Sequence, residues 1–135
     1  METIRTVYLG ELRTEAEHVS SGEKIITDAP VDNHGKGEAF SPTDLMSASL
    51  GSCMMTLMGI AARTHEIPFE NIGCKITKVM AANPRRVHEI VVEFDMGATQ
   101  YTDKQKAILS NAAKTCPVAL SLHPDLKQTV SFIYS

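Results

Sequence analysis

Two cysteines are the residues of this sequence best suited to chemistry. Cys53 lies in the middle of a long apolar segment, and Cys116 is followed directly by Pro117. A free thiol has a pKa of about 8.5, so it needs a nearby cation or a helix N-terminus to react well as a thiolate. Two thiols that lie close together can carry out a two-step reaction, because one reacts with a peroxide and the other condenses with the resulting sulfenic acid. Their separation along the chain leaves open whether they meet.

The same cysteines also fit a plainer interpretation, in which they are small buried hydrophobic residues. For the chemical interpretation the available cations are Arg13 on an expected early strand, Arg63 at the end of the apolar segment, and Arg85 or Arg86 in an expected hairpin. A third cysteine, Cys74, begins a strand-like segment and has no partner motif. We expect Cys74 to be structural.

The elements before Cys53 are expected to be strands followed by one long helix. Three strand-like segments cover residues 3–9, 13–19 and 23–27. Short breaks that contain Gly10 and Gly22 separate them, which is typical of an antiparallel meander. Residues 28–37 are rich in Pro, Asp, Asn and Gly and are expected to form a loop.

The start of the long helix is marked by three residues. Ser41 is suited to cap it, Pro42 fits the first helical position, and Asp44 completes a capping box. The helix is expected to end near Thr64. It is apolar or small on nearly all sides, which predicts a central, wrapped helix. The uncharged run 45–62 is near the lower limit of membrane-spanning length, but its Ser, Thr and Gly content and its lack of flanking aromatic residues favour a buried helix over a membrane span.

The second half of the chain alternates strands and helices again. Strand-like runs at 70–80 and 86–94 are joined by a probable hairpin at 81–85, and a last strand is expected at 127–134. Between them, a helix begins with a capping box of Thr102 and Gln105. Pro117 disfavours the helical conformation at the residue before it, so the helix is expected to stop there and restart with Cys116 at its N-terminus.

The resulting order, βββ-α-ββ-α-β, predicts an α+β fold and a single domain over residues 1–135. With 135 residues and 43% hydrophobic content, the chain is long enough to bury a core without disulfides or metals. Its net charge of −3, without basic clusters, argues against a nucleic-acid partner.

Three widely spaced cysteines and an opening segment without an apolar core favour a reducing, cytoplasmic compartment. No nucleotide, flavin or haem motif is visible, and the histidines lack metal-ligand spacing. We therefore expect no cofactor.

Residues 40–53 (FSPTDLMSASLGSC), together with residues 114–120 (KTCPVAL), resemble the OsmC/Ohr family of organic hydroperoxide resistance proteins. The resemblance combines a Ser-Pro helix start before one cysteine, a Cys-Pro-Val second site and a compatible order of strands. It implies an intertwined homodimer, with two helices packed centrally between antiparallel sheets and active sites at the subunit interface.

The resemblance also implies roles for individual residues. Cys53 would be the peroxidatic nucleophile and Cys116 the resolving thiol. In the family an early-strand arginine pairs with a glutamate that directly follows the proline at the helix start, and Arg13 matches that arginine. The glutamate position is Thr43 here, and the nearest acid, Asp44, lies about 100° further around the helix. Either Asp44 caps its own helix while Glu38 supplies the charge, or Asp44 itself pairs with the arginine.

Two methionines next to the thiol motif, Met46 and Met54, suit an apolar pocket for an organic substrate; the simpler interpretation places them in the core. The implied activity is a thiol-dependent peroxidase, with an organic hydroperoxide as substrate and a dithiol as reductant. The alternative is a non-catalytic member of the same fold that binds a small ligand or senses redox state.

Overall fold

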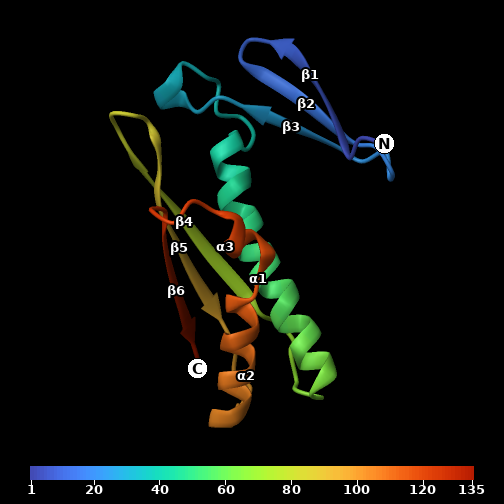
Figure 1. Ribbon diagram of the computed structural model, residues 1–135, viewed down its shortest axis with the longest axis vertical. Coiled ribbons are helices and arrows are strands. Elements are labelled where there is room, and N and C mark those ends of the chain that lie inside the picture. The colour runs from blue at the N-terminus through green and yellow to red at the C-terminus, as the bar shows by residue number, and fades with distance from the viewer. The chain divides into compact units, whose positions relative to one another are not determined.

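The computed structural model describes residues 1–135, which form two compact units, Met1–Met46 and Ser47–Ser135 (Figure 1). The first unit contains the antiparallel meander that the sequence predicts. Its strands are β1 (Ile4–Gly10), β2 (Arg13–His18) and β3 (Lys24–Asp28), in the order β1-β2-β3. A single 3-10 turn, η1 (Val31–Asn33), lies within the predicted loop.

A tight turn between β1 and β2 places Arg13 at the start of its strand. Glu11 and Leu12 both have positive φ, 56° and 62°, as does the preceding Gly10. Two successive residues of this kind make a turn whose twist matches that of the flanking strands. The Leu12 amide donates to the Tyr8 hydroxyl at 3.2 Å. Arg13 is thereby paired opposite Gly10, at the end of the hairpin.

The first unit has no buried hydrophobic side chain. Its buried residues are Thr27, Asp28 and Ser41, all polar. Large apolar side chains on its strands and turn are exposed instead: Ile4, Val7, Tyr8, Leu9, Leu12 and Ile25. A three-stranded sheet needs an apolar face that is covered for independent stability. The residues of the first unit do not provide such a covered apolar face by themselves.

The long helix α1 (Pro42–Thr64) begins and ends where the sequence predicts. The Asp44 amide donates to the Ser41 hydroxyl, and the Ser41 amide donates to a carboxylate oxygen of Asp44, both at 3.0 Å. This reciprocal pair is the predicted capping box, which satisfies backbone donors that have no partner within the helix.

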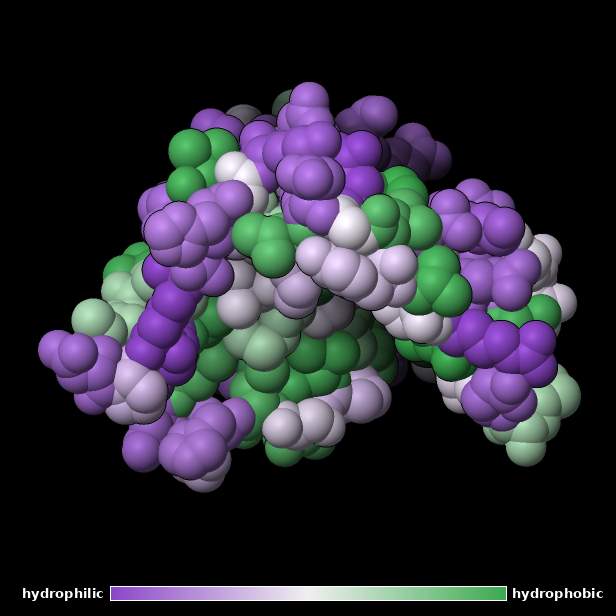
Figure 2. All heavy atoms as spheres, turned by 90° about the horizontal axis from the view of Figure 1, so that it is seen from above, coloured by the Kyte–Doolittle hydropathy of each residue, from purple (hydrophilic) through white to green (hydrophobic).

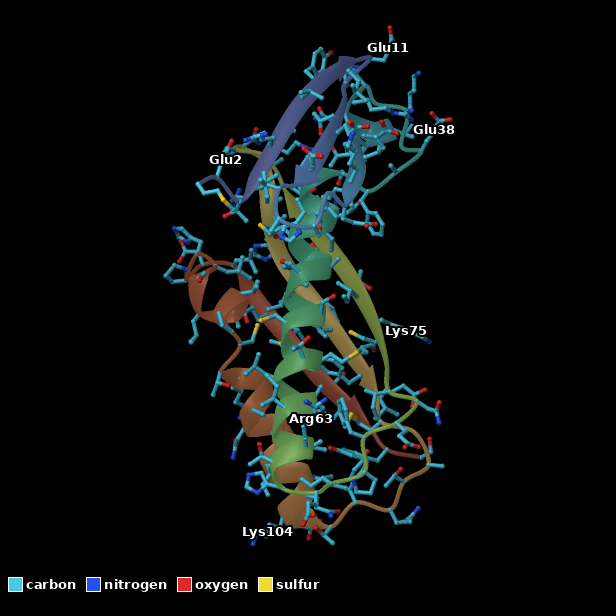
Figure 3. The ribbon with its side chains drawn as sticks, turned by 90° about the vertical axis from the view of Figure 1, so that its right-hand side faces the viewer. Glu2, Glu11, Glu38, Arg63, Lys75 and Lys104 are labelled. Carbon is cyan, nitrogen blue, oxygen red and sulfur yellow. The ribbon has the colours of Figure 1, made fainter.

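The second unit is a three-stranded sheet with helices on one face (Figures 1 and 3). Its strands β4 (Gly73–Ala81), β5 (Arg86–Asp95) and β6 (Lys127–Ile133) are ordered β4-β5-β6. Between β5 and β6 come α2 (Asp103–Lys114) and α3 (Pro117–Ser121), with the predicted capping box at Thr102 and Gln105.

The α+β fold class is confirmed, with one difference in strand direction. The hairpin of β4 and β5 is antiparallel, whereas β6 pairs with β5 in parallel. We expected antiparallel sheets. The α2–α3 segment is long enough to carry the chain back to the end of the sheet where β5 begins, which a parallel pairing requires.

The core of the second unit lies between this sheet and the helices. Strand β5 contributes alternate side chains, Ile90, Val92 and Phe94, each fully buried, and Phe94 stacks on Phe132 of β6 with ring centroids 5.4 Å apart. The helices contribute Leu50, Met54, Met58 and Ala62 from α1 and Leu109 and Ala113 from α2.

The composition of α1 predicts a helix wrapped on all sides, but in this chain one side of it is exposed. Its exposed residues Ser49, Ser52, Thr56, Ile60 and Arg63 follow one another at helical spacing. The chain by itself buries only the opposite side. By length and composition alone, α1 is apolar enough to cross a membrane, a test that the core helices of soluble proteins also pass. Figure 2 shows hydrophobic surface remaining between the hydrophilic side chains.

Two glycines of α1 provide a matched test of how closely this helix packs. A Cβ atom at Gly51 would lie 2.5 Å from Cδ1 of Ile76 and 3.2 Å from Sγ of Cys74, whereas at Gly59 it would make ordinary contacts of 3.7 Å with Phe69. We expect Gly59→Ala to stabilise by roughly 0.5–1 kcal/mol through helix propensity. Gly51→Ala gains the same propensity, but we expect overpacking to make it destabilising by about 1 kcal/mol. Urea denaturation of both variants measures the difference, and equal stabilisation would contradict the close packing at Gly51.

Candidate active site

The structure brings Cys53 and Cys116 together. Cys53 lies in the middle of α1 and is partly exposed, and Cys116 directly precedes α3 and is fully buried. Their side chains are hydrogen-bonded to each other. Two neighbouring thiols, one of them partly exposed, are the arrangement that a two-cysteine redox step needs.

The position of Cys116 follows from the proline after it. Helix α2 ends at Lys114, and α3 begins with Pro117 at its first position, as the sequence predicts. Cys116 is the N-cap residue between them, and its sulfur accepts the Ala119 amide at 3.4 Å. The side-chain amide of Gln128, on β6, donates to the Ala119 carbonyl at 2.9 Å and so fastens α3 to the sheet.

The two thiols have different electrostatic surroundings. Burial raises the pKa of the Cys116 thiol, and the hydrogen bond that it donates to Cys53 raises that pKa further. The backbone amide of Ala119 acts in the opposite direction but is the smaller effect. Cys116 therefore keeps its proton and directs it at the Cys53 sulfur.

The third cysteine lies on β4 and faces α1. Cys74 is half-buried beside Gly51, and burial raises the pKa of the Cys74 thiol. Buried, protonated thiols are unreactive. This placement agrees with the structural role expected for it.

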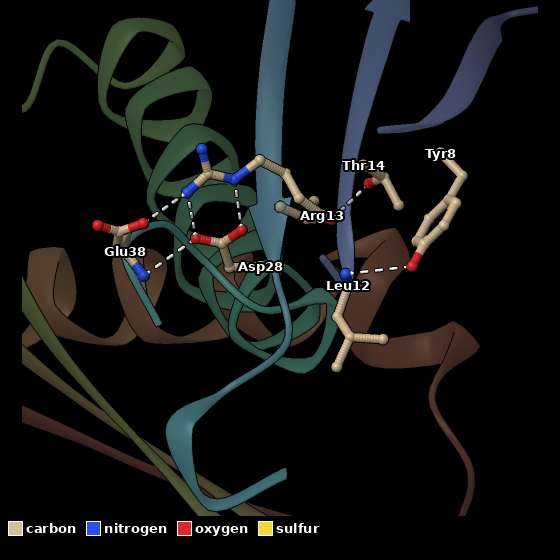
Figure 4. Close-up of polar contacts among 7 residues, drawn as sticks. Tyr8, Leu12, Arg13, Thr14, Asp28 and Glu38 are labelled. Carbon is tan, nitrogen blue, oxygen red and sulfur yellow. Dashed lines mark hydrogen bonds and ion pairs between the residues drawn. The ribbon is translucent and has the colours of Figure 1, made fainter. Parts of the chain in front are cut away.

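In the first unit, Arg13 forms a charged cluster with two carboxylates (Figure 4). Its Nε donates to Oδ1 of Asp28 at 2.7 Å and its Nη2 to Oδ2 at 2.9 Å, a bidentate pair across neighbouring strands. The same Nη2 donates to Oε1 of Glu38 at 2.9 Å. The Asp28 side chain is fully buried, whereas that of Glu38 is 64% exposed.

Asp28 also closes the loop that leads to α1. Its Oδ2 accepts the Glu38 amide at 3.0 Å, and its own amide donates to the Phe40 carbonyl at 3.0 Å. Gly35 allows the loop to fold tightly, because a Cβ atom there would lie 1.7 Å from the Ala29 carbonyl oxygen. The Asp28 side chain thus joins β2, β3 and the segment that precedes the helix.

The charges in this cluster reinforce one another. The guanidinium of Arg13 holds the pKa of the Asp28 carboxyl below its usual range, and the Glu38 amide and the charge of Lys36 act in the same direction. In return, the hydrogen bonds to Asp28 raise the pKa of Arg13. Both groups are therefore ionised throughout the physiological range.

The arginine–carboxylate pair involves different acids from those at the helix start. Asp44 caps α1 through Ser41, as one interpretation proposed, and Glu38 contacts Arg13 together with Asp28. Sequence reasoning missed Asp28. The sequence pattern places Asp28 at the start of the loop that follows the third predicted strand, but in the structure it ends β3, where the antiparallel register pairs it with Arg13.

The other predicted residues are placed as follows. Met54 is only 3% exposed, in the core of the second unit, and Met46 is half-buried near the start of α1. Arg63, on the last turn of α1 (Figure 3), lines an open cavity of about 570 Å³. Arg86 donates to the carbonyls of Ala82 and Pro84 within its own hairpin. No three His, Cys, Asp or Glu side chains are grouped to hold a metal ion.

Together, fold and site define an α+β protein with a hydrogen-bonded thiol pair between a long central helix and the start of a short one. A family model for OsmC-like proteins matches residues 35–131. An osmotic stress induced and detoxification response protein from Psychrobacter arcticus is 52% identical, with a TM-score of 0.94, over 98% of this chain and 96% of that one.

More distant structures share the fold. The organic hydroperoxide resistance protein OsmC from Legionella pneumophila is 16% identical with a TM-score of 0.77, covering 98% of this chain and 97% of its own. An organic hydroperoxide resistance protein from Elizabethkingia anophelis is 10% identical with a TM-score of 0.77, over 100% and 98%. No curated protein matches the chain. The chain belongs to the OsmC/Ohr family, and this membership supports a redox or detoxification role in stress response.

The different surroundings of the cysteines predict an order of labelling. In the folded, reduced protein we expect an alkylating reagent at neutral pH to modify Cys53 before Cys74 or Cys116, because burial raises the pKa of the latter two. Peptide mass mapping over time measures the three rates. The denatured protein, where all three are exposed, is the control. Labelling of Cys116 as fast as Cys53 would contradict the assigned surroundings.

The charged cluster predicts a pH-dependent effect of Asp28→Asn. A carboxyl whose pKa is lowered by folding stabilises the folded state above its unfolded pKa, of about 4, and loses that contribution as pH falls through the folded value. We therefore expect the variant to be less stable than the parent at pH 7, with the gap narrowing below about pH 4. Urea unfolding at several pH values measures it. Glu38→Gln, at an exposed acid with one contact, is the control and is expected to change stability little.

Proposed function

We propose that this protein is a thiol-dependent peroxidase that reduces organic hydroperoxides in oxidative stress defence. The observation that carries the proposal is the direct hydrogen bond between Cys116 and Cys53. It supports two neighbouring thiols with different surroundings, one partly exposed and one buried. Family membership supports the same class of chemistry.

The reaction proceeds in two thiol steps. The Cys53 thiolate attacks the terminal oxygen of the hydroperoxide, so that a sulfur–oxygen bond forms and the oxygen–oxygen bond breaks. The leaving alkoxide takes a proton and departs as the alcohol, and Cys53 is left as a sulfenic acid. The Cys116 sulfur then attacks Cys53, a disulfide forms, and water leaves. An external dithiol supplies two electrons and two protons to restore both cysteines.

Two further features of the site belong to this proposal. The family resemblance implies that Arg13 supplies the positive charge for the reactive thiolate, and the ion pair with Asp28 keeps Arg13 charged. The half-buried Met46 contributes apolar surface for an organic substrate, whereas Met54, which is 3% exposed, belongs to the core. Asp44 acts at the start of α1 through its capping bonds.

The working form is proposed to be a homodimer. The exposed side of α1 and the uncovered apolar residues of β1 are surfaces that a single chain leaves to water. Covering them with a second copy buries both, at about 25 cal/mol for each Å² of apolar area. We further propose a cytoplasmic location, as one domain without nucleic-acid or membrane partners.

Intact mass and thiol counting test the proposal. One equivalent of an organic hydroperoxide is expected to remove two hydrogens and two thiols, mapped to Cys53 and Cys116, faster than hydrogen peroxide does. Cys53→Ser should abolish the reaction, because it removes the nucleophile. Cys116→Ser should reduce one equivalent and stop as a sulfenate that is open to overoxidation. Cys74→Ser is the matched control and should behave as the parent.

Two outcomes would contradict the assignment. Equal loss of the first reduction in the Cys53 and Cys116 variants would reject the separate roles of the thiols. An unchanged mass in the parent would reject the peroxidase and leave a non-catalytic protein that binds a small ligand.

A further inference from the structure

We propose that a cavity in the second unit is a binding site for a small organic oxyanion, a carboxylate or phosphate group that carries an apolar body. The cavity has a volume of about 600 Å³ and lies between the β4–β5 hairpin and the turn that joins α3 to β6. Both segments lie at the end of the sheet where β5 begins (Figure 1). The proposed peroxidase reaction uses none of the residues that line this cavity, so the inference goes beyond that function and does not depend on it.

Arg86 lines the cavity and is held in place by its own hairpin. Its Nη1 donates to the carbonyls of Ala82 at 3.2 Å and Pro84 at 2.8 Å. Its Nε and Nη2 donate to no protein group. These two nitrogens form the edge of a guanidinium that matches the two oxygens of a carboxylate or phosphate. One nitrogen therefore fixes the side chain, and its bidentate edge is left for a ligand.

The Arg13 cluster of the same chain shows what this edge binds. The Nε and Nη2 of Arg13 hold the two carboxylate oxygens of Asp28 at 2.7 Å and 2.9 Å. Arg86 has no such partner, because it forms no ion pair with any acid of the protein. An oxyanion from outside the chain would supply the missing pair of acceptors.

An irregularity in β5 places a second donor, His88, at the cavity. Val79 of β4 pairs with Glu89. The next residue, Met80, pairs with Val87, so His88 is left without a partner on β4. Extra residues of this kind are common beside functional sites, where they redirect a side chain. The His88 imidazole lines the cavity and makes no hydrogen bond to the protein, so its N–H is available to a ligand.

The turn after α3 provides a third donor, in a defined tautomer. The Asp125 amide donates to Nδ1 of His123 at 3.0 Å. Because an amide can only donate, Nδ1 is the acceptor nitrogen, which assigns the proton of the neutral ring to Nε2. The Leu126 amide donates to the His123 carbonyl, also at 3.0 Å, and closes the turn. The Nε2–H group of His123 thus joins Arg86 and His88 as a donor without a protein acceptor.

The remaining walls of the cavity suit an apolar body. Pro84, Val87 and Leu126 contribute hydrocarbon surface, and Val87 is largely buried. Small-molecule sites are typically cavities of about 300–1,000 Å³ with apolar walls and a few polar groups that fix orientation. This cavity falls within that range of volume. The arrangement favours an organic anion over a bare inorganic ion.

One acid lines the cavity and opposes an anion. The Asp125 side chain is 93% exposed, with its carboxylate 3.9 Å from Nδ1 of His123. The field of a charge this exposed is strongly screened by water and salt. Arg86 offers a charge of the opposite sign together with two aligned hydrogen bonds, which Asp125 does not offset. We therefore expect Asp125 to weaken anion binding without preventing it.

Titration with benzoate and with phenyl phosphate tests the proposal on the reduced full-length protein. NMR spectroscopy follows the imidazole signals of the five histidines. We expect the signals of His88 and His123 to shift, and those of His18, His34 and His65 to stay unchanged. The probe that binds more tightly identifies the headgroup. Benzyl alcohol lacks the charge and inorganic phosphate lacks the ring, so each should bind about tenfold more weakly.

Four variants assign the contacts. Arg86→Gln should weaken binding of the tighter probe about tenfold, because the charge and the bidentate edge are lost. His88→Gln should weaken it about threefold. Since His88 has no hydrogen bond to lose, this variant keeps the test decisive if Arg86→Gln disturbs its hairpin. Asp125→Asn should tighten binding about twofold. Arg5→Gln, at an arginine that pairs with Glu2 outside the cavity, is the matched control and should bind as the parent does.

Three results would overturn the inference. The first is that neither charged probe shifts the signals of His88 and His123. The second is that benzyl alcohol binds as tightly as the charged probes, which would mean that the cavity recognises only the apolar ring. The third is that Arg86→Gln and His88→Gln both bind like the parent. None of these measurements involves peroxide or Cys53, so they leave the test of the proposed function separate.

Discussion

The close packing of α1 on its sheet is the constraint on which the rest of the second unit depends. Gly51 brings the helix so near to β4 that no Cβ atom fits without displacing Ile76. Leu50, Met54 and Met58 are buried along the same helix. Cys53 is two residues beyond Gly51, about 200° around the helix, so its side chain is turned away from that contact. The thiol is thereby left accessible to Cys116.

Two buried ionisable groups of this chain, Cys116 and Asp28, are stabilised in opposite charge states. The Cys116 thiol is kept neutral, because burial raises its pKa and keeps its proton in place as a hydrogen-bond donor. The Arg13 cluster is built from full charges, and there the ion pair lowers the pKa of a buried carboxyl. Burial favours the neutral form of a group unless a partner offsets its desolvation. Asp28 has a charged partner of this kind, whereas the backbone amide that Cys116 accepts is too small an effect to offset its burial.

A single chain leaves an unusual amount of apolar surface uncovered. Residues Met1–Met46 bury only polar side chains, although their strands carry Ile4, Val7, Tyr8 and Ile25. Helix α1 was expected to be wrapped, yet the chain covers only one side of it. The proposed homodimer would cover the second side of α1, which would reconcile the helix's apolar composition with its exposure in the single chain.

Local signals in the sequence determined the elements and their ends. Ser41, Pro42 and Asp44 marked the start of α1, and Thr102 with Gln105 marked that of α2, because capping depends on residues within one turn. Pro117 likewise determined the helix break that puts Cys116 at an N-cap. Only the tertiary structure decided the parallel direction of β6, the contact between Cys53 and Cys116, and the choice of Asp28 and Glu38 as partners of Arg13. Each of these joins residues far apart in the chain, and their meeting depends on strand register and helix packing, which no local pattern specifies.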